Sequence, residues 1–158
     1  MFREMRRFKQ QISTEKCIEM LKKEPRGVLS VLGDEDYPYG MPINFYYDEQ
    51  DGKIYFHCAK QGHKVDSLNK HDKVSFCIYD QGYQEEGQWP LHINSVIAFG
   101  RIKMVEDYEK TVEKSRMLGL KYYPTAESVE EEIKRDVSRV QLLEMTIEHM
   151  TGKLVKES

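Results

Sequence analysis

The sequence predicts a mainly β protein with peripheral helices, in which six antiparallel strands form one sheet. The first observation is a series of six runs rich in β-branched and aromatic residues, at 28–32, 41–47, 53–58, 74–79, 95–105 and 139–148. The second is that short segments full of turn residues, 33–36 and 48–52, join the first three runs. Such connections suit antiparallel hairpins, whereas parallel strands need long crossovers. We expect the sheet to close into a barrel, because closure removes exposed strand edges.

Four helices are expected around this sheet. The first begins at Ser13 or Thr14, either of which can cap a helix N-terminus, and ends before Pro25. Its apolar residues Cys17 and Leu21 fall on one side, as in a helix that packs against a core. Apolar spacing and turn signals predict the other three at 64–70, 107–118 and 128–134.

Length, charge and cysteine content narrow the class of protein. The 158 residues suit one domain spanning 1–158. The net charge of −3 comes from interspersed acids and bases, so no basic stripe points to a nucleic acid. No apolar run is long enough to cross a bilayer and no signal peptide is visible, so we expect a cytoplasmic protein. The three cysteines form no CxxC pair and the histidines lack metal-ligand spacing, so we expect reduced thiols and no metal site.

The most informative segment is 54–64, IYFHCAKQGHK. A strand is expected to end near Cys58, and a helix to begin at about Lys64. Gly62 permits backbone conformations that other residues avoid, and Lys64 adds a cation where the first N–H groups of the helix are free. This arrangement favours a phosphate or another anion. By itself, the segment also fits an ordinary strand, turn and helix with solvated basic residues.

Seven short segments, in this order, resemble the FMN-binding split-barrel superfamily that includes pyridoxamine 5′-phosphate oxidase. They are 5–7 (MRR), 27–30 (GVLS), 38–39 (PY), 42–45 (PINF), 56–64 (FHCAKQGHK), 95–100 (SVIAFG) and 150–153 (MTGK). The similarity is greater to the nitroimidazole-resistance branch of flavoproteins. It covers nearly the whole chain.

The resemblance implies a homodimer with two FMN molecules in clefts at the subunit interface. It places the phosphate at the turn after the third strand, with Lys64 and His63 as its cations and Ala59 and Gly62 in the same turn. The flavin ring would lie along the second strand and the start of the third, against Pro42, Ile43, Asn44, His57 and Cys58. Apolar walls with a few hydrogen bonds suit such a ring.

Three candidate residues carry open alternatives. Asn44, inside an otherwise apolar strand, either has a ligand or backbone partner, because burial without a partner would cost free energy, or faces solvent. His57 is a candidate catalytic residue that donates a hydrogen bond or relays a proton, or else a histidine that only packs. Trp89, in the long polar loop 81–91, either covers the flavin of the partner subunit or anchors its own loop. For Lys153, an exposed position in a C-terminal tail is expected rather than a cofactor contact.

The chain departs from the oxidase pattern in two places. His63 stands where the oxidases have an arginine, and a mostly neutral histidine without the bidentate fork holds phosphate less strongly. The chain ends HMTGKLVKES instead of in the tryptophan- and arginine-containing tail of the oxidases. Pyridoxamine phosphate oxidation is therefore not expected.

The leading hypothesis is an FMN-dependent oxidoreductase that passes electrons from a cellular reductant to a small acceptor such as a nitroaromatic. No GxGxxG fingerprint is present, so a nicotinamide donor would stack directly on the flavin. The alternative is a stress or sensor protein that binds flavin or haem without turnover.

Overall fold

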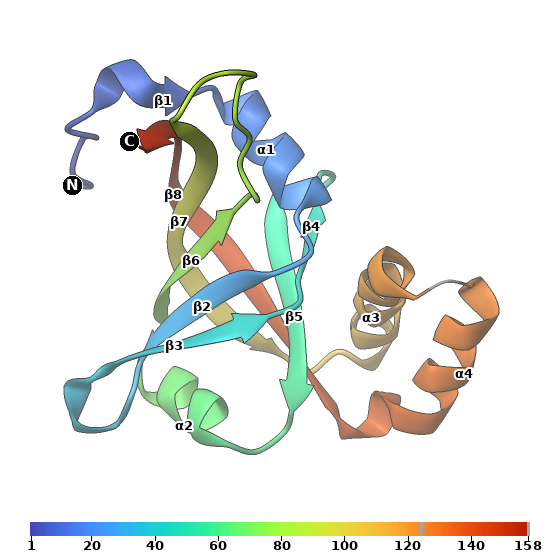
Figure 1. Cartoon of the computed structure of the whole chain (residues 1–158). Helices are drawn as coiled ribbons and strands as arrows, with labels where there is room; N and C mark the ends of the chain where they lie inside the picture. The colour runs from blue at the N-terminus through green and yellow to red at the C-terminus, as the bar shows by residue number, and fades with distance from the viewer. Residues whose placement is uncertain (124, 158) are drawn as a thin grey trace.

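The computed structural model describes residues 1–123 and 125–157, which form one antiparallel sheet with helices around it (Figure 1). The strands are β1 (Gln11–Ile12), β2 (Gly27–Leu32), β3 (Pro38–Ile43), β4 (Tyr46–Asp48), β5 (Lys53–Ala59), β6 (Lys73–Tyr79), β7 (Leu91–Val105) and β8 (Val140–Glu157). The α-helices are α1 (Thr14–Lys23), α2 (His63–Lys70), α3 (Tyr108–Tyr122) and α4 (Ala126–Asp136). Short 3₁₀ turns are η1 (Phe8–Gln10), η2 (Asp34–Asp36) and η3 (Val137–Arg139). The predicted mainly β fold with peripheral helices is confirmed.

The sheet differs from the prediction in strand number and in closure. It has eight strands in the order β3-β2-β6-β7-β8-β5-β4, with β1 paired to β8. The predicted strand 41–47 is two strands, because the chain breaks at Asn44 and Phe45 between β3 and β4. β3 pairs with β2, whereas β4 pairs with β5 at the other end of the sheet. In the part of the chain that is described, no ladder joins β3 to β4, so the barrel is not closed.

The two longest strands, β7 and β8, pair with each other along almost their whole length. A bulge lies between Phe99 and Gly100, where a Cβ atom on Gly100 would come within 2.1 Å of the Thr146 carbonyl oxygen. The predicted last strand, 139–148, is too short, because β8 runs on to Glu157. Lys153 therefore lies half-buried in β8 opposite Ser95, not in an exposed tail as expected.

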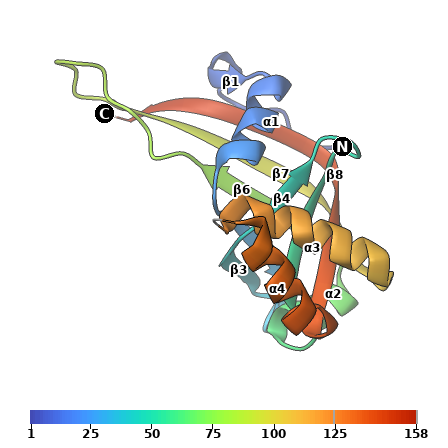
Figure 2. The same ribbon diagram turned by 90° about the vertical axis from the view of Figure 1, so that its right-hand side faces the viewer.

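The four predicted helices are present, with bounds that differ by a few residues. Ser13 caps α1, since its Oγ accepts a hydrogen bond from the Lys16 backbone N–H at 3.1 Å. Helices α3 and α4 lie together on one side of the sheet, as Figures 1 and 2 show. They pack closely, because a Cβ on Gly119 of α3 would lie 2.9 Å from a methyl group of Val129 in α4.

The first half of strand β5 is buried on both faces and separates two cores, whereas His57 and Ala59 in its second half are exposed. Ile54 and Phe56 belong to the main core inside the sheet. Tyr55 points the other way, into a smaller cluster with Val105 and Leu142. The second face of β5 is thus the one that α3 covers.

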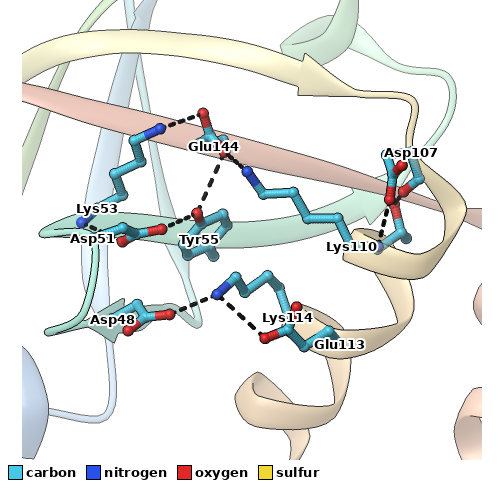
Figure 3. A network of polar contacts seen from close by, with 10 residues as sticks. Asp48, Asp51, Lys53, Tyr55, Asp107, Lys110, Glu113, Lys114 and Glu144 are labelled. Atoms are coloured by element: carbon cyan, nitrogen blue, oxygen red, sulfur yellow. Dashed lines mark hydrogen bonds and ion pairs between the residues drawn. The ribbon is translucent and has the colours of Figure 1, made fainter.

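A network of ion pairs fastens α3 to this second face (Figure 3). The Glu144 carboxylate of β8 accepts hydrogen bonds from Lys110 of α3 and, at 2.8 Å, from Lys53 of β5. Lys114 of α3 donates to Asp48 of β4 at 2.6 Å, and both side chains are about nine-tenths buried. Position and orientation of α3 therefore depend on pairs that join three strands to one helix.

Acid is expected to weaken the protein through Glu144. Burial would raise the pKa of Glu144, but hydrogen bonds and charge from Lys110 and Lys53 outweigh burial and lower the pKa to about 2. A depressed pKa stabilises the fold fully above the unfolded value of about 4.3, and the stabilisation is lost as pH falls toward about 2. We expect the Glu144 carboxylate to contribute about 2–3 kcal/mol at neutral pH. Urea unfolding at several values of pH measures this.

Glu148 provides the matched control for Glu144 on the same strand. Its exposed carboxylate pairs with Arg101 at 2.8 Å. Glu144→Gln should lower stability at pH 7 and flatten its dependence on pH below about 4.5, whereas Glu148→Gln should do little. Equal pH profiles for the two variants would contradict the assignment.

Candidate functional site

Four of the predicted flavin-ring residues line one open recess. Pro42, Ile43 and Asn44 come from the end of β3, and His57 comes from β5. The fifth lining residue is Arg26, and the recess has a volume of about 620 Å³. The break between β3 and β4 forms this recess, because the chain turns away from β2 at Asn44 to join β5.

The break itself is held by side chains that follow it much later in the sequence. The Tyr122 hydroxyl, at the end of α3, accepts from the Phe45 backbone N–H at 2.9 Å and lies 2.6 Å from the Pro25 carbonyl oxygen. Lys121 donates to the Phe45 carbonyl at 3.1 Å, and burial lowers the pKa of Lys121 to about 8. The recess is therefore positioned by α3 as well as by the sheet.

Asn44 is half-buried, and a hydrogen bond fixes the orientation of its side-chain amide. Its Oδ1 accepts a hydrogen bond from Arg26 Nε at 3.2 Å. Within the described residues, no protein group accepts from the Asn44 amide nitrogen, so its donors are available to a ligand. Arg26 adds a fixed positive charge at the same edge of the recess.

His57 lies where the recess meets the helices α3 and α4. Desolvation lowers the pKa of His57, with the charge of Glu132 opposing this effect and that of Lys64 adding to it. The imidazole is consequently neutral at pH 7 and can accept a proton. Cys58, the next residue, packs against the main core, so only its backbone can face the recess.

The turn after β5 leads from the recess to the N-terminus of α2. Gly62 precedes this helix with φ of 135°, and a side chain there would meet no atom within 4 Å. No side chain caps α2, so its first N–H groups are free to bind an anion. Lys64 lies in the first turn of α2, and Ala59 and Gly62 lie in the approach to it.

His63 is held against the hairpin between β2 and β3. Its Nε2 accepts from the Asp34 backbone N–H at 3.2 Å, and its ring stacks on Tyr39 with centroids 4.2 Å apart. When the ring is neutral, its proton is therefore on Nδ1, which is the donor left for a ligand. Tyr39 and Pro42 both belong to β3 and lie about 10 Å apart along it, with their side chains on opposite faces of the strand.

Trp89 is not brought to this site within one chain. The loop 80–90 lies at the opposite end of the sheet from α2, and it projects away from the body of the molecule (Figures 1 and 2). The Trp89 side chain is 81% exposed, so it does not anchor its own loop by burial. Its proposed contact with a partner's flavin stays a prediction.

Three residues that position the site were absent from the predicted set: Arg26, Tyr39 and Tyr122. Arg26 immediately precedes β2 and Tyr39 lies within β3, but their contacts depend on the register between strands. Tyr122 is 77 residues from Phe45 in the chain. No local pattern marks such a contact.

Among residues 1–123 and 125–157, no group of three or more His, Cys, Asp and Glu side chains is arranged to hold a metal ion. Over the same residues, no helix is long and apolar enough to cross a membrane. Cys17, Cys58 and Cys77 are free thiols.

Solved structures of other proteins have a fold similar to that of this chain. The chain resembles the structure of a candidate 5-nitroimidazole antibiotic resistance protein from Bacteroides thetaiotaomicron, at 19% identity and a TM-score of 0.76, over 92% of this chain and 87% of that one. A conserved hypothetical protein from Mycobacterium tuberculosis matches at 14% identity and a TM-score of 0.80, over 95% and 90%. An FAD-binding protein from Mycobacterium smegmatis matches at 19% identity and a TM-score of 0.68, over 94% and 99%.

No curated protein matches the chain. The family model described as pyridoxamine 5′-phosphate oxidase, however, matches residues 13–154, which include every strand except β1 and the last residues of β8. This match covers most of the chain, and the open antiparallel sheet agrees with it. The chain belongs to the pyridoxamine 5′-phosphate oxidase family and has a split-barrel fold.

Proposed function

We propose that this protein binds FMN and acts as an oxidoreductase that transfers electrons to a small acceptor such as a nitroaromatic. The observation that carries the proposal is that β5 provides His57 to the recess and leads within five residues to Gly62, at the uncapped N-terminus of α2. The recess has apolar walls and aimed donors, and the helix N-terminus has backbone donors with Lys64 nearby. A flavin ring and a terminal phosphate need these two kinds of surface.

Each residue of the candidate site suits a particular part of the FMN molecule. Pro42 and Ile43 would contact the ring through apolar surface, while the free amide donors of Asn44 would bind a ring carbonyl or nitrogen. Lys64, His63 Nδ1 and the first N–H groups of α2 would hold the phosphate. When bound, the flavin supplies the redox chemistry, and the protein positions it and sets its potential. His57 would accept a proton beside the ring, since its imidazole is neutral.

FMN is favoured over FAD by the position of the anion site. FAD-binding proteins are among the structural neighbours, so the choice needs an argument from this chain. Backbone donors and Lys64 converge at one end of α2, which suits a single terminal phosphate. FAD would have to carry a diphosphate and an adenosine past this turn.

A homodimer is part of the proposal. Neighbouring residues of β2, β6 and β7 form an uncharged outer row of Val28, Cys77 and Ile97, beside exposed Tyr79 and Phe99. A second copy of the chain would bury this row and bring a partner's loop 80–90 toward a flavin. Sedimentation should then give a dimer, and a monomer at micromolar concentration would contradict this part.

We also infer one domain over 1–158 and a cytoplasmic location.

Cofactor extraction and anaerobic reoxidation test the function. The purified protein should be yellow, absorb near 450 nm and release FMN on denaturation, as flavoproteins do. After anaerobic reduction, a nitroaromatic should reoxidise the bound flavin faster than buffer does. FMN binding without faster reoxidation by any of a panel of acceptors would support a storage or sensor protein instead, and failure to take up any flavin would refute both.

Lys64→Ala is expected to weaken FMN binding by about 10- to 100-fold while riboflavin binding changes little, because a charge-assisted contact to phosphate contributes roughly 1.5–3 kcal/mol. Fluorescence titration with the two flavins measures the effect. Lys70→Ala is the control, since Lys70 lies exposed at the other end of the same helix. Equal losses for FMN and riboflavin would remove Lys64 from the phosphate site.

A further inference from the structure

A second cavity lies next to His57, between α3, α4 and the adjoining ends of β5 and β8. His57 lines both this cavity and the recess described above. The cavity has a volume of about 50 Å³, enough for roughly three or four water-sized groups. A whole aromatic ring is too large for it, but the head group of a molecule lying in the recess is not.

The walls of this cavity are mainly apolar, with one exception that points to a ligand. Val129 and Ile133 of α4 and Val140 of β8 supply apolar surface. Ser115 of α3 also lines the cavity, and its Oγ is buried with no hydrogen-bond partner among the described residues. A buried hydroxyl without a partner costs about 1–3 kcal/mol, so a group that accepts its proton would be bound favourably.

Charge at the rim restricts what can enter. Glu132 and Asp136 of α4 both border the cavity. Asp136 is neutralised by ion pairs with Arg135, at 2.7 Å, and with Arg139. Glu132 forms no ion pair with a cationic side chain in the described part of the chain. An anionic head group would therefore meet an uncompensated carboxylate.

We propose that this cavity selects the acceptor, by taking an uncharged planar head group with hydrogen-bond-accepting oxygens, such as a nitro or carbonyl group, and by rejecting a carboxylate. The inference rests on the proposed function, because it supposes that the rest of the acceptor lies in the recess. Ser115 Oγ would donate to one oxygen of the head group. His57 would contact the same molecule where the two hollows meet.

Nitrobenzene and benzoate form a sharp pair of probes, because a nitro group and a carboxylate have nearly the same shape and differ in charge. Binding is measured by chemical shifts of the Val129 and Ile133 methyl groups, in protein as purified and after addition of FMN. We expect saturable shifts with nitrobenzene and at least tenfold weaker binding of benzoate. Equal affinity for both probes, or no shifts at these methyl groups, would overturn the proposal.

Three variants sharpen the test. Ser115→Ala should weaken nitrobenzene binding by about three- to tenfold without lowering stability, since it removes a hydroxyl that has no partner. A loss of stability together with unchanged binding would instead show a structural role. Glu132→Gln should improve benzoate binding by about three- to tenfold, whereas Glu131→Gln, at an exposed neighbouring position outside the cavity, should not.

The cavity and the proposed function can fail separately. Probe binding at Val129 and Ile133 in a protein that takes up no flavin would support the cavity and refute the flavin function. FMN uptake with no probe binding at these methyl groups would support FMN binding and refute the proposed role of the cavity.

Discussion

Lys114→Ala is expected to lower the free energy of unfolding by about 3–5 kcal/mol, because it leaves the Asp48 carboxylate buried without its partner. The two side chains form a 2.6 Å ion pair and are only 10% and 8% exposed. Burial is the largest single effect and lowers the pKa of Lys114, but the hydrogen bond and charge of Asp48, together with the charges of Glu113 and Asp51, outweigh it, so the net shift is upward. The Asp48 pKa is correspondingly lowered: burial would raise it, but hydrogen bonds from Lys114 and from the Gln50 N–H outweigh burial. The pair is thus ionised in the folded protein.

Lys22 provides the control for an ion pair of similar geometry at the surface. It lies 2.8 Å from Glu49, with both side chains at least half exposed. Lys22→Ala should lower the free energy of unfolding far less than Lys114→Ala, since exposed pairs contribute little. Urea unfolding of both variants gives the comparison, and similar losses would contradict the assignment. The double variant Asp48→Asn with Lys114→Met should recover much of the stability, because no buried charge is left unpaired.

Loss of Lys114 is also expected to destabilise the part of α3 that contributes to the site. Ser115, on the cavity wall, follows Lys114 in α3, and Tyr122 ends the same helix. Hydrogen exchange in Lys114→Ala should therefore become faster in α3 before it does in β7.

Tyr122→Phe is expected to lower stability by about 1–3 kcal/mol and to weaken FMN binding about tenfold. The substitution deprives the Phe45 N–H of an acceptor and the Pro25 carbonyl of a neighbouring hydroxyl. Phe45 is buried, so its N–H without a partner costs about 1–3 kcal/mol, whereas Pro25 is exposed and its carbonyl can bind water instead. Because these contacts hold the break beside Asn44, the recess should widen when they are lost. Unfolding in urea and fluorescence titration with FMN measure the two effects.

Tyr108→Phe is the matched control, since Tyr108 begins the same helix and its side chain is 66% exposed. It should change neither stability nor FMN affinity. A stable Tyr122→Phe protein with unchanged FMN affinity would show that α3 does not position the recess.

Local patterns in the sequence were sufficient for most of the secondary structure. Ser13 caps the first helix as expected, because an N-cap depends only on residues within one turn. The strand, glycine turn and helix of 54–64 also formed as predicted, since β-branched residues and Gly62 act locally. The order of matched segments along the chain was sufficient to identify the family.

Contacts between distant segments were not encoded in such patterns. The run 41–47 is continuous in hydrophobicity, and its break at Asn44 follows from contacts with Tyr122, far along the chain. Strand β8 extends to Glu157 because β7 provides a partner for its ladder, although the terminal sequence reads as a polar tail.

The sequence by itself determined the fold class, the helices and the segments that carry the candidate flavin site, because each depends on periodicity, caps and turns within a few residues. Only the tertiary structure decided that β3 and β4 part at the recess and that His57 separates two hollows. It also decided that Cys58 turns toward the core and that α3 is fastened by buried ion pairs. These features depend on packing and on charge pairing across long separations, whose energies no local pattern expresses.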